Sequence, residues 1–538
     1  MRRMALHPAL FAGLFTALGV AIGARSAAAQ TVTRGPYLGS MAATAVTICW
    51  RTSTATASRV DVGESPGDLT QSFTDPTITA NHEIRITGLQ PAHSYAYRVG
   101  SPAVLLTAAS NDYRFKTAPT PGSATPVRVW LVGDSGESGS GGQTVRDRAE
   151  TWCGTRPPDL WLMLGDNAYS SGSDTEYQAG CFDQYPSQLR RWPLFPTRGN
   201  HDNVSAGANN DFLDFFALPS GGQCGGLASG NELYYSFDWG RVHFVCLDSQ
   251  DSDRSLGGPM LQWMRQDLAA TSADWVVCYW HHPPYTNGSH NSDNNGDSGG
   301  RMVDMRQNVV PMMDSIGVDL VFSGHSHGYE RSYLLNGHYG TSKTLTTSMK
   351  AGSGDGRPNG GGPYQKAHIG KYPFEGAVYT VAGSSSKVDG VSSMPCMVSS
   401  ISVMGSMIVD FAGNRVDARF LDINGAVRDS FAIVKGTTLA SGPPPVSGLS
   451  LASPRPNPSR GPVTFEFELP RAGAATLDVL DAAGRRVTRL VDDTRPAGRQ
   501  HVEWRGMGAL GRPAPAGLYW AVLTAAGETR VRRVVLTP

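Results

Sequence analysis

Short apolar runs in the middle of the chain end at chemically reactive side chains. Four of these runs have the length and composition of buried strands: residues 127–132, 160–164, 275–280 and 318–322. They lead into Asp134, Asp166, His281, His325 and His327. Since open α/β sheets gather ligands in the crevice beyond the carboxyl ends of their strands, the pattern predicts that these side chains meet there.

The N-terminal flank alternates between apolar and polar positions instead. Strand-like segments separated by turn signals are residues 46–50, 84–86 and 95–99. We therefore predict an all-β domain over residues 30–118, followed by a linker rich in proline, glycine, serine and threonine at 118–126. Residues 89–95 resemble a strand connection of fibronectin type III domains, which implies a β sandwich. Two roles are open for this N-terminal domain: a passive scaffold, or a module that shapes the substrate entrance or binds matrix.

The C-terminal flank also alternates. Residues 463–469 follow the strand period strictly, after a stiff proline-rich linker at 437–449. With the segments 456–458, 481–485 and 517–520, the tail 450–538 resembles the small all-β sandwich used as a C-terminal secretion-sorting domain or as the Ig-like domain of flagellar hook caps. That resemblance implies contact with a cell surface or secretion machinery. A plain accessory domain is the alternative.

The candidate site residues fall into five clusters in chain order: Asp134; Asp166 with Tyr169; Asn200 with His201; His281 with His290; and His325 with His327. Each cluster alone has an ordinary interpretation, such as a turn, a polar loop or a capped strand end. The order of carboxylates, amide and imidazoles at strand ends instead favours a phosphoesterase with two metal ions.

From about residue 127 to 384 the chain resembles the purple acid phosphatase branch of the calcineurin-like metallophosphoesterases. The most specific motifs are Gly165-Asp166-Asn167-Ala168-Tyr169 and Gly324-His325-Ser326-His327-Gly328-Tyr329-Glu330-Arg331. For residues 127–436 the resemblance implies an α/β core of two packed mixed sheets flanked by helices.

The resemblance also implies the roles of the clustered residues. One metal would be held by Asp134, Asp166, Tyr169 and His327, and the other by Asp166, Asn200, His281 and His325. Phenolate and carboxylate oxygens suit Fe(III), and imidazoles suit Zn, Mn or Fe(II). Asn200, His201 and His290 would contact the phosphate, and His201 and His290 are candidates for protonating the leaving group. A histidine in an exposed loop is the alternative for His290.

Three positions depart from the pattern or vary within it. Asn291 stands where plant-type members often have a second histidine, so substrate preference is open. Asp202 stands where many relatives have Glu, and we expect it to act indirectly on the site. His282 occupies a variable position, and we interpret it as structural or as an indirect support for the ligands.

Composition and charge narrow the classes of partner. The chain has 538 residues with no net charge, but residues 450–538 carry +5 and residues 30–449 carry −8. An acidic body argues against a nucleic-acid footprint. The expected partners are therefore phosphate-ester small molecules, attracted by the metals.

The N-terminus has the pattern of a secretory signal: Arg2 and Arg3, an apolar stretch, and small residues that favour cleavage after Ala29. An uncleaved membrane anchor is the alternative. We expect a mature chain with no membrane span that is periplasmic, displayed at the cell surface or extracellular. Seven cysteines fit an oxidising compartment, and Cys153 with Cys181 is the favoured disulfide pair, ahead of Cys224 with Cys396. Cys246 and Cys278 are predicted to be buried thiols.

The sequence as a whole predicts an exported acid phosphatase-type enzyme that cleaves phosphomonoesters with water activated by two metals. The same ligands would also serve a phosphodiesterase or a nucleotide hydrolase. A protein of another class, a surface adhesin or glycan-binding protein with a vestigial core, is disfavoured because no ligand is missing from the clusters.

Overall fold

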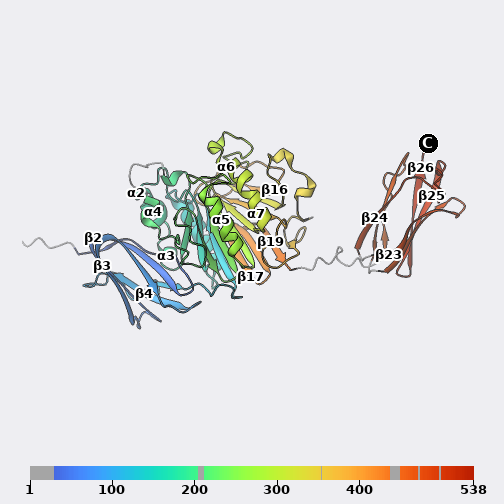
Figure 1. Ribbon diagram of the computed structural model, residues 1–538. Coiled ribbons are helices and arrows are strands. Elements are labelled where there is room, and N and C mark those ends of the chain that lie inside the picture. The colour runs from blue at the N-terminus through green and yellow to red at the C-terminus, as the bar shows by residue number, and fades with distance from the viewer. Residues whose placement is uncertain are drawn as a thin grey trace, which may run out of the picture.

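The computed structural model describes residues 29–203, 211–352, 354–436, 449–469, 473–495, 498–509 and 511–538. Along the chain it has an N-terminal β-rich domain, a central core with two mixed sheets and a C-terminal β-rich domain (Figure 1). This confirms the predicted fold class. The predicted signal segment and nearly all of the predicted linker 437–449 lie outside the described residues.

The N-terminal domain is an antiparallel sheet built on two long strands. Its strands are β1 (Val32–Gly39), β2 (Ala45–Gly63), β3 (Gln71–Thr87), β4 (Ser94–Gly100) and β5 (Arg114–Lys116). The first half of β2 pairs with β1 and the end of β3, whereas the second half pairs with β4 and the start of β3. Register shifts between Arg51 and Ser58 separate these halves. Val46, Ile48 and Val60 are fully buried, as the alternation predicts.

The core contains two seven-stranded sheets. The first has the order β14 (Tyr364–Lys366), β19 (Val427–Lys435), β18 (Arg415–Asp422), β17 (Gly405–Ala412), β6 (Val127–Val132), β7 (Leu160–Leu164) and β8 (Leu194–Thr197). The second has the order β16 (Met397–Ile401), β13 (Tyr329–Leu335), β15 (Ala377–Ala382), β12 (Leu320–Ser323), β11 (Trp275–Tyr279), β10 (Val242–Cys246) and β9 (Tyr235–Trp239). Strands β6, β7 and β8 are parallel, as are β10, β11, β12 and β15. The carboxyl ends of these parallel strands carry the candidate residues.

The described part of the core also contains helices. They are α1 (Ser140–Cys153), α2 (Asp174–Tyr177), α3 (Pro186–Leu189), α4 (Asp211–Phe215), α5 (Pro259–Ala270), α6 (Arg301–Asp304) and α7 (Val310–Ile316). Short helical turns are η1 (Gln178–Phe182), η2 (His201–Asn203), η3 (Asp297–Gly300), η4 (Met305–Val309), η5 (Ser342–Thr344) and η6 (Thr347–Met349). On α5, Leu261, Met264 and Leu268 recur at helical spacing and pack with Val276 and Val321 of the second sheet.

The C-terminal domain has two sheets and an apolar cluster of its own. One sheet is β20 (Ser450–Leu451), β21 (Val463–Leu469) and β24 (Gly498–Trp504), and the other is β23 (Arg486–Arg495), β22 (Gly473–Asp481), β25 (Gly517–Ala525) and β26 (Glu528–Leu536). The cluster includes Phe465, Phe467, Leu477 and Trp504 and takes no residue from before Leu449. Residues of β21 alternate between buried and more exposed positions, which confirms the strand predicted there.

The seven cysteines are free and buried, so the predicted pairing of Cys153 with Cys181 is wrong, as is that of Cys224 with Cys396. Cys153 ends α1, and Cys181 lies in η1. Burial raises the pKa of both thiols, and the charge that opposes this rise comes from Arg128 at Cys153 and from Arg34 at Cys181. Burial raises the pKa of Cys181 to about 12. Among the described residues, no helix is both long enough and apolar enough to span a membrane.

A buried histidine ties the second sheet to the helix that covers it. His243 on β10 is 2% exposed. Its Nδ1 lies 2.7 Å from Asp238 Oδ1 on β9, and its Nε2 lies 2.8 Å from Asp267 Oδ2 on α5. Burial lowers the pKa of His243, but the hydrogen bonds with Asp238 and Asp267 outweigh it and raise the pKa to about 9. The folded protein therefore holds the imidazolium at neutral pH.

We expect the protein to lose stability as the pH rises from about 6.5 to about 9. An unfolded histidine titrates near pH ~6.5, so protonated His243 stabilises the fold fully below that pH. The contribution disappears as the pH passes the folded-state pKa of about 9, and it is worth at most about 3 kcal/mol. Urea unfolding between pH 6 and 10 measures it. The same pH dependence in His243→Gln would contradict this account.

Candidate metal centre

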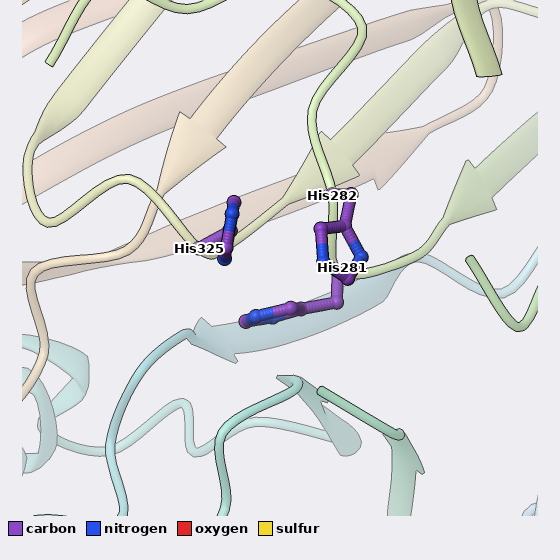
Figure 2. Close-up of side chains that lie close together, drawn as sticks. All are labelled: His281, His282 and His325. Atoms are coloured by element: carbon purple, nitrogen blue, oxygen red, sulfur yellow. The ribbon is translucent and has the colours of Figure 1, made fainter. Parts of the chain in front are cut away.

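Three histidines gather beyond the carboxyl ends of β11 and β12. His281 and His282 follow β11, His325 follows β12, and Figure 2 shows their side chains grouped together. One nitrogen of each lies within 4.8 Å of the others, and a second group of the same kind joins His281 to Asp134 and Asp166. The two groups share His281, so carboxylates from the first sheet and imidazoles from the second meet at one place.

The backbone is held in an unusual conformation at three predicted ligands. Asp134, Asp166 and His325 have φ values of 52°, 53° and 70°. The left-handed region is costly for residues with a Cβ, and such strain persists where the surrounding structure enforces it, often at functional sites. His325 N–H donates to Asp134 Oδ2 at 2.7 Å, which is one contact that enforces it.

Two glycines allow the ligand segments to approach each other closely. A Cβ added to Gly165, whose φ is +88°, would lie 2.4 Å from His281 Nδ1. A Cβ on Gly199 would lie 2.2 Å from Asp166 Oδ1. Both positions therefore need glycine for steric reasons.

Tyr169 reaches both carboxylates. Its hydroxyl donates to Asp166 Oδ2 at 2.9 Å and to Asp134 Oδ1 at 3.2 Å. Burial raises the pKa of Tyr169 well above its usual value, and the two carboxylates raise it further. Burial and the charge of Asp166 likewise raise the pKa of Asp134. A bound cation would reverse both shifts, because it favours the phenolate and the carboxylate.

The imidazoles are oriented so that one nitrogen remains for a metal. His281 Nδ1 donates to the Leu164 carbonyl at 2.8 Å, and burial lowers the pKa of the ring, so its Nε2 is an unprotonated acceptor. That Nε2 faces Asn200 Oδ1 at 3.0 Å and Asp166 Oδ1 at 3.4 Å. Because the Asn200 amide turns its oxygen toward His281, three acceptor atoms meet here: His281 Nε2, Asn200 Oδ1 and Asp166 Oδ1. His327 Nδ1 bonds to Asp389 Oδ2 at 2.6 Å.

This donor set fits the metals that the sequence implies. Acceptor atoms that face one another suit a cation, and hydrogen bonds on the far nitrogens are typical of metal-binding histidines. One ion would be offered mainly oxygen atoms, by Asp134, Asp166 and Tyr169. His327 adds a nitrogen to this group, because its Nε2 lies 3.6 Å from Asp134 Oδ1. The nitrogen-rich group of Asn200, His281 and His325 would hold the other ion, with Asp166 positioned to contact both.

His201 and His290 each contact a member of this group. His201 N–H donates to Asp166 Oδ1 at 2.9 Å, and its Nδ1 bonds to the Ser170 carbonyl at 2.8 Å. His290 stacks on His325 with ring centroids 3.8 Å apart and bonds through Nδ1 to Asp297 Oδ1 at 2.8 Å. The structure therefore brings all the predicted site residues together, and it does not leave His290 as an isolated loop histidine.

Asp202 and His282 are buried beside the predicted ligands and stabilise the segments that carry them. Asp202 is 2% exposed and accepts from the backbone N–H groups of Asn167 at 2.8 Å and Gly199 at 2.7 Å. It thereby joins the segments that carry Asp166 and Asn200. His282 is buried, shares two hydrogen bonds with Ser249 and lies 4.3 Å from His325 between ring centroids. Its proximity to His325 was not predicted.

The sequence did not predict three further residues that contact the site. Ser298 Oγ lies 2.6 Å from His325 Nε2, Asp389 holds His327, and Lys387 Nζ lies 3.9 Å from the centroid of the Tyr169 ring. All three lie in irregular segments rich in Gly and Ser. None of the three directly follows a strand: Ser298 lies beyond the loop after β11, and Lys387 and Asp389 follow the end of β15 by five and seven residues.

Comparisons with known proteins show which families the chain resembles. Residues 127–329 match the family model of the calcineurin-like phosphoesterases, which makes the core metallophosphoesterase-like. Within that class the chain is purple acid phosphatase-like, because residues 36–117 match the N-terminal domain model of purple acid phosphatases. Residues 457–528 match the FlgD Ig-like domain model. The family resemblance stated from the sequence is thus confirmed.

Curated relatives agree with this assignment. Purple acid phosphatases 15 and 23 of Arabidopsis thaliana are each 30% identical, over 47% and 49% of this chain. The chain spans 49% and 60% of their lengths. Among solved structures, purple acid phosphatase PPD1 of yellow lupin gives a TM-score of 0.57 at 16% identity, covering 75% of both chains. PhoD gives a TM-score of 0.53 at 14% identity, covering 74% of this chain and 89% of its own. These two likenesses establish the fold.

Proposed function

We propose that the protein is an exported phosphohydrolase that cleaves phosphomonoesters at a dinuclear centre of the purple acid phosphatase type. The observation that carries the proposal is the convergence of Tyr169, two buried carboxylates and the acceptor nitrogen of His281. When bound, Fe(III) with Zn, Mn or Fe(II) would polarise the phosphoryl group and lower the pKa of a water to about 7.

The chain's own residues orient the ester and move the proton. His201 and His290 flank the centre, and each has Nδ1 engaged with an acceptor, which leaves Nε2 for the substrate. In this arrangement they bind phosphoryl oxygens, and one protonates the departing alkoxide. A positioned acid of this kind contributes about 10²- to 10⁴-fold.

The visible absorption spectrum of the protein lacking residues 1–29 tests this centre. Under oxidising conditions we expect a broad visible band from tyrosinate bound to Fe(III), and we expect Tyr169→Phe to abolish it. A colourless protein that still binds two metals would contradict the iron assignment. Comparing turnover of monoesters and diesters separates phosphatase from phosphodiesterase or nucleotide hydrolase activity.

Lys387 adds a protein cation beside the centre. Its Nζ lies over the Tyr169 ring, and its charge opposes the raised pKa of Asp134. We expect Lys387→Met to raise KM for a phosphomonoester about 10-fold, since one charge-assisted hydrogen bond is worth about 1.5 kcal/mol. Inorganic phosphate should weaken as a competitive inhibitor to the same extent.

The matched control is Lys350→Met. Lys350 Nζ lies 3.6 Å from the centroid of the Tyr333 ring, the same kind of contact, and its backbone bridges to Leu335 at the end of β13 away from the centre. Equal KM values for the Lys387 and Lys350 variants would show that Lys387 does not contact the substrate.

The C-terminal domain is proposed as an attachment or sorting module that contacts a cell surface or secretion machinery. Its separate apolar cluster supports a unit that folds independently of the core. Removing residues 437–538 should therefore leave the specific activity unchanged and alter where the exported protein is found. Unchanged distribution between cells and medium would reject this role.

A further inference from the structure

The segment that follows Tyr169 is held by one carboxylate. Glu176 accepts from the backbone N–H groups of Ser170 at 2.8 Å, Ser171 at 3.1 Å and Ser173 at 2.9 Å. The hydroxyls of Ser171 and Ser173 also donate to it, at 2.7 and 2.9 Å. Although burial opposes the shift, these bonds lower the pKa of Glu176 to about 2, so it stays a carboxylate.

That segment orients His201. The Ser170 carbonyl accepts from His201 Nδ1 at 2.8 Å, and the His201 and Tyr169 rings lie 4.7 Å apart between centroids. Glu176 therefore binds the N–H groups on both sides of the Ser170 carbonyl that accepts from His201. It touches none of the predicted metal ligands, so any effect on the reaction passes through the segment.

Glu176 lies on α2, and α2 is clamped by the N-terminal domain. Arg34 on β1 and Arg51 on β2 are direct partners in the sheet register, and both guanidiniums bind Asp174 at the start of α2. Arg51 makes three contacts with this carboxylate, at 2.6 to 2.8 Å. Arg34 also donates from Nε to Gln178 Oε1 at 2.8 Å.

The clamp is built into the interface between the domains. Arg34 is 3% exposed, and its guanidinium lies 4.4 and 4.2 Å from the centroids of the Phe182 and Phe215 rings. On α2 itself, the Tyr177 hydroxyl donates to Asp202 Oδ1 at 2.7 Å. One short helix thus contacts the N-terminal domain, the Tyr169 segment and the carboxylate that joins the ligand segments.

We infer that the N-terminal domain sets the position of His201 through α2, with Arg51 and Glu176 as positioning residues. The inference rests on the proposed function, in which His201 contacts the phosphate. It assigns the N-terminal domain a role in the reaction beyond that of a passive scaffold. The coupling passes through a continuous series of contacts. The Arg51 guanidinium binds Asp174 on α2, and the same helix carries Glu176. Glu176 in turn binds Ser170, whose carbonyl accepts from His201.

The test uses Glu176→Gln and Arg51→Met in the metal-loaded protein. We expect kcat to fall about 10- to 100-fold in Glu176→Gln, because a misplacement of about 1 Å in a substrate-positioning residue can cost about 10²-fold. We expect a smaller fall in Arg51→Met, with metal content unchanged in both. The control is Arg59→Met, because Arg59 is on the same strand and pairs with Asp61 at 2.8 Å instead of α2.

Two readouts do not depend on turnover. Hydrogen exchange at the amides of Ser170, Ser171 and Ser173 should accelerate in both variants and stay unchanged in Arg59→Met. Acceleration in Arg51→Met would show coupling at a distance, since Arg51 contacts none of these amides. In the zinc-loaded protein, the NMR signal of His201 with a proton on Nδ1 should be lost in Glu176→Gln.

Unchanged exchange and an unchanged His201 signal in both variants would overturn the inference, and so would a fall in kcat that only follows lost metal. Failure of the proposed function has a different signature. The wild-type protein would then turn over no phosphate ester, while the exchange and NMR measurements would still decide whether α2 positions His201.

Discussion

Asp166→Asn is expected to abolish phosphate-ester hydrolysis and to reduce the number of metal ions held by each chain. Asp166 is 1% exposed, and its two oxygens contact different parts of the site. Oδ2 accepts from Tyr169, and Oδ1 lies 3.4 Å from His281 Nε2. An amide has no charge and one acceptor oxygen, so it cannot serve both ions. The loss should exceed the about 10- to 100-fold that removal of an outer partner costs.

Metal analysis and steady-state kinetics on one preparation measure this effect. Asp159→Asn is the matched control, because Asp159 precedes β7 at the end opposite to Asp166. Its Oδ2 accepts from the Arg128 backbone N–H at 2.8 Å, a bond that an amide oxygen can also accept. Activity retained in Asp166→Asn would place the active site elsewhere.

The sequence predicted which residues lie together at the site because their signal is local. Each ligand cluster except that of Asn200 and His201 directly follows a strand-like apolar run, and the parallel strands β6, β7, β11 and β12 bring them together. The family motifs supplied the pairing of Tyr169 with Asp166. Nothing in that signal indicated the left-handed backbone of Asp134, Asp166 and His325, because such a conformation is enforced by contacts between segments.

The supporting residues could not be predicted for the same reason. Asp389 holds His327 across 62 positions of sequence, and Arg34 reaches Asp174 across 140. Contacts of this range depend on how the segments pack, which periodicity does not encode. The wrong disulfide prediction has a related cause. Cys153 and Cys181 flank the Asp166 loop in the sequence, but in the fold they lie in separate buried surroundings.

A buried charge cluster joins the two sheets of the core. Asp319, which precedes β12, is fully buried. Its Oδ1 lies 2.6 Å from Lys366 Nζ at the end of β14, and its Oδ2 lies 2.7 Å from Lys435 Nζ at the end of β19. Oδ2 also accepts the Val276 N–H of β11 at 2.9 Å. One carboxylate in the second sheet therefore pairs with two lysines of the first.

Asp319→Ala is expected to destabilise the protein by about 3 to 5 kcal/mol, the cost of leaving a buried charge without its partner. Burial already lowers the pKa of Lys435 while Asp319 opposes this, so removing the carboxylate should lower that pKa further. Lysine deprotonation would then relieve part of the loss, and the destabilisation should diminish as the pH rises. Urea unfolding at pH 6 and pH 9 measures both effects.

A triple variant separates the charges from the packing. Asp319→Leu combined with Lys366→Met and Lys435→Met removes all three charges with side chains that fill the space, and apolar replacement of a buried ion cluster is often neutral or stabilising. We expect it to recover most of the stability that Asp319→Ala loses. If the triple variant is as unstable as Asp319→Ala, the cluster acts through the Val276 hydrogen bond and its geometry, and the lysine charges are not the cause of the loss.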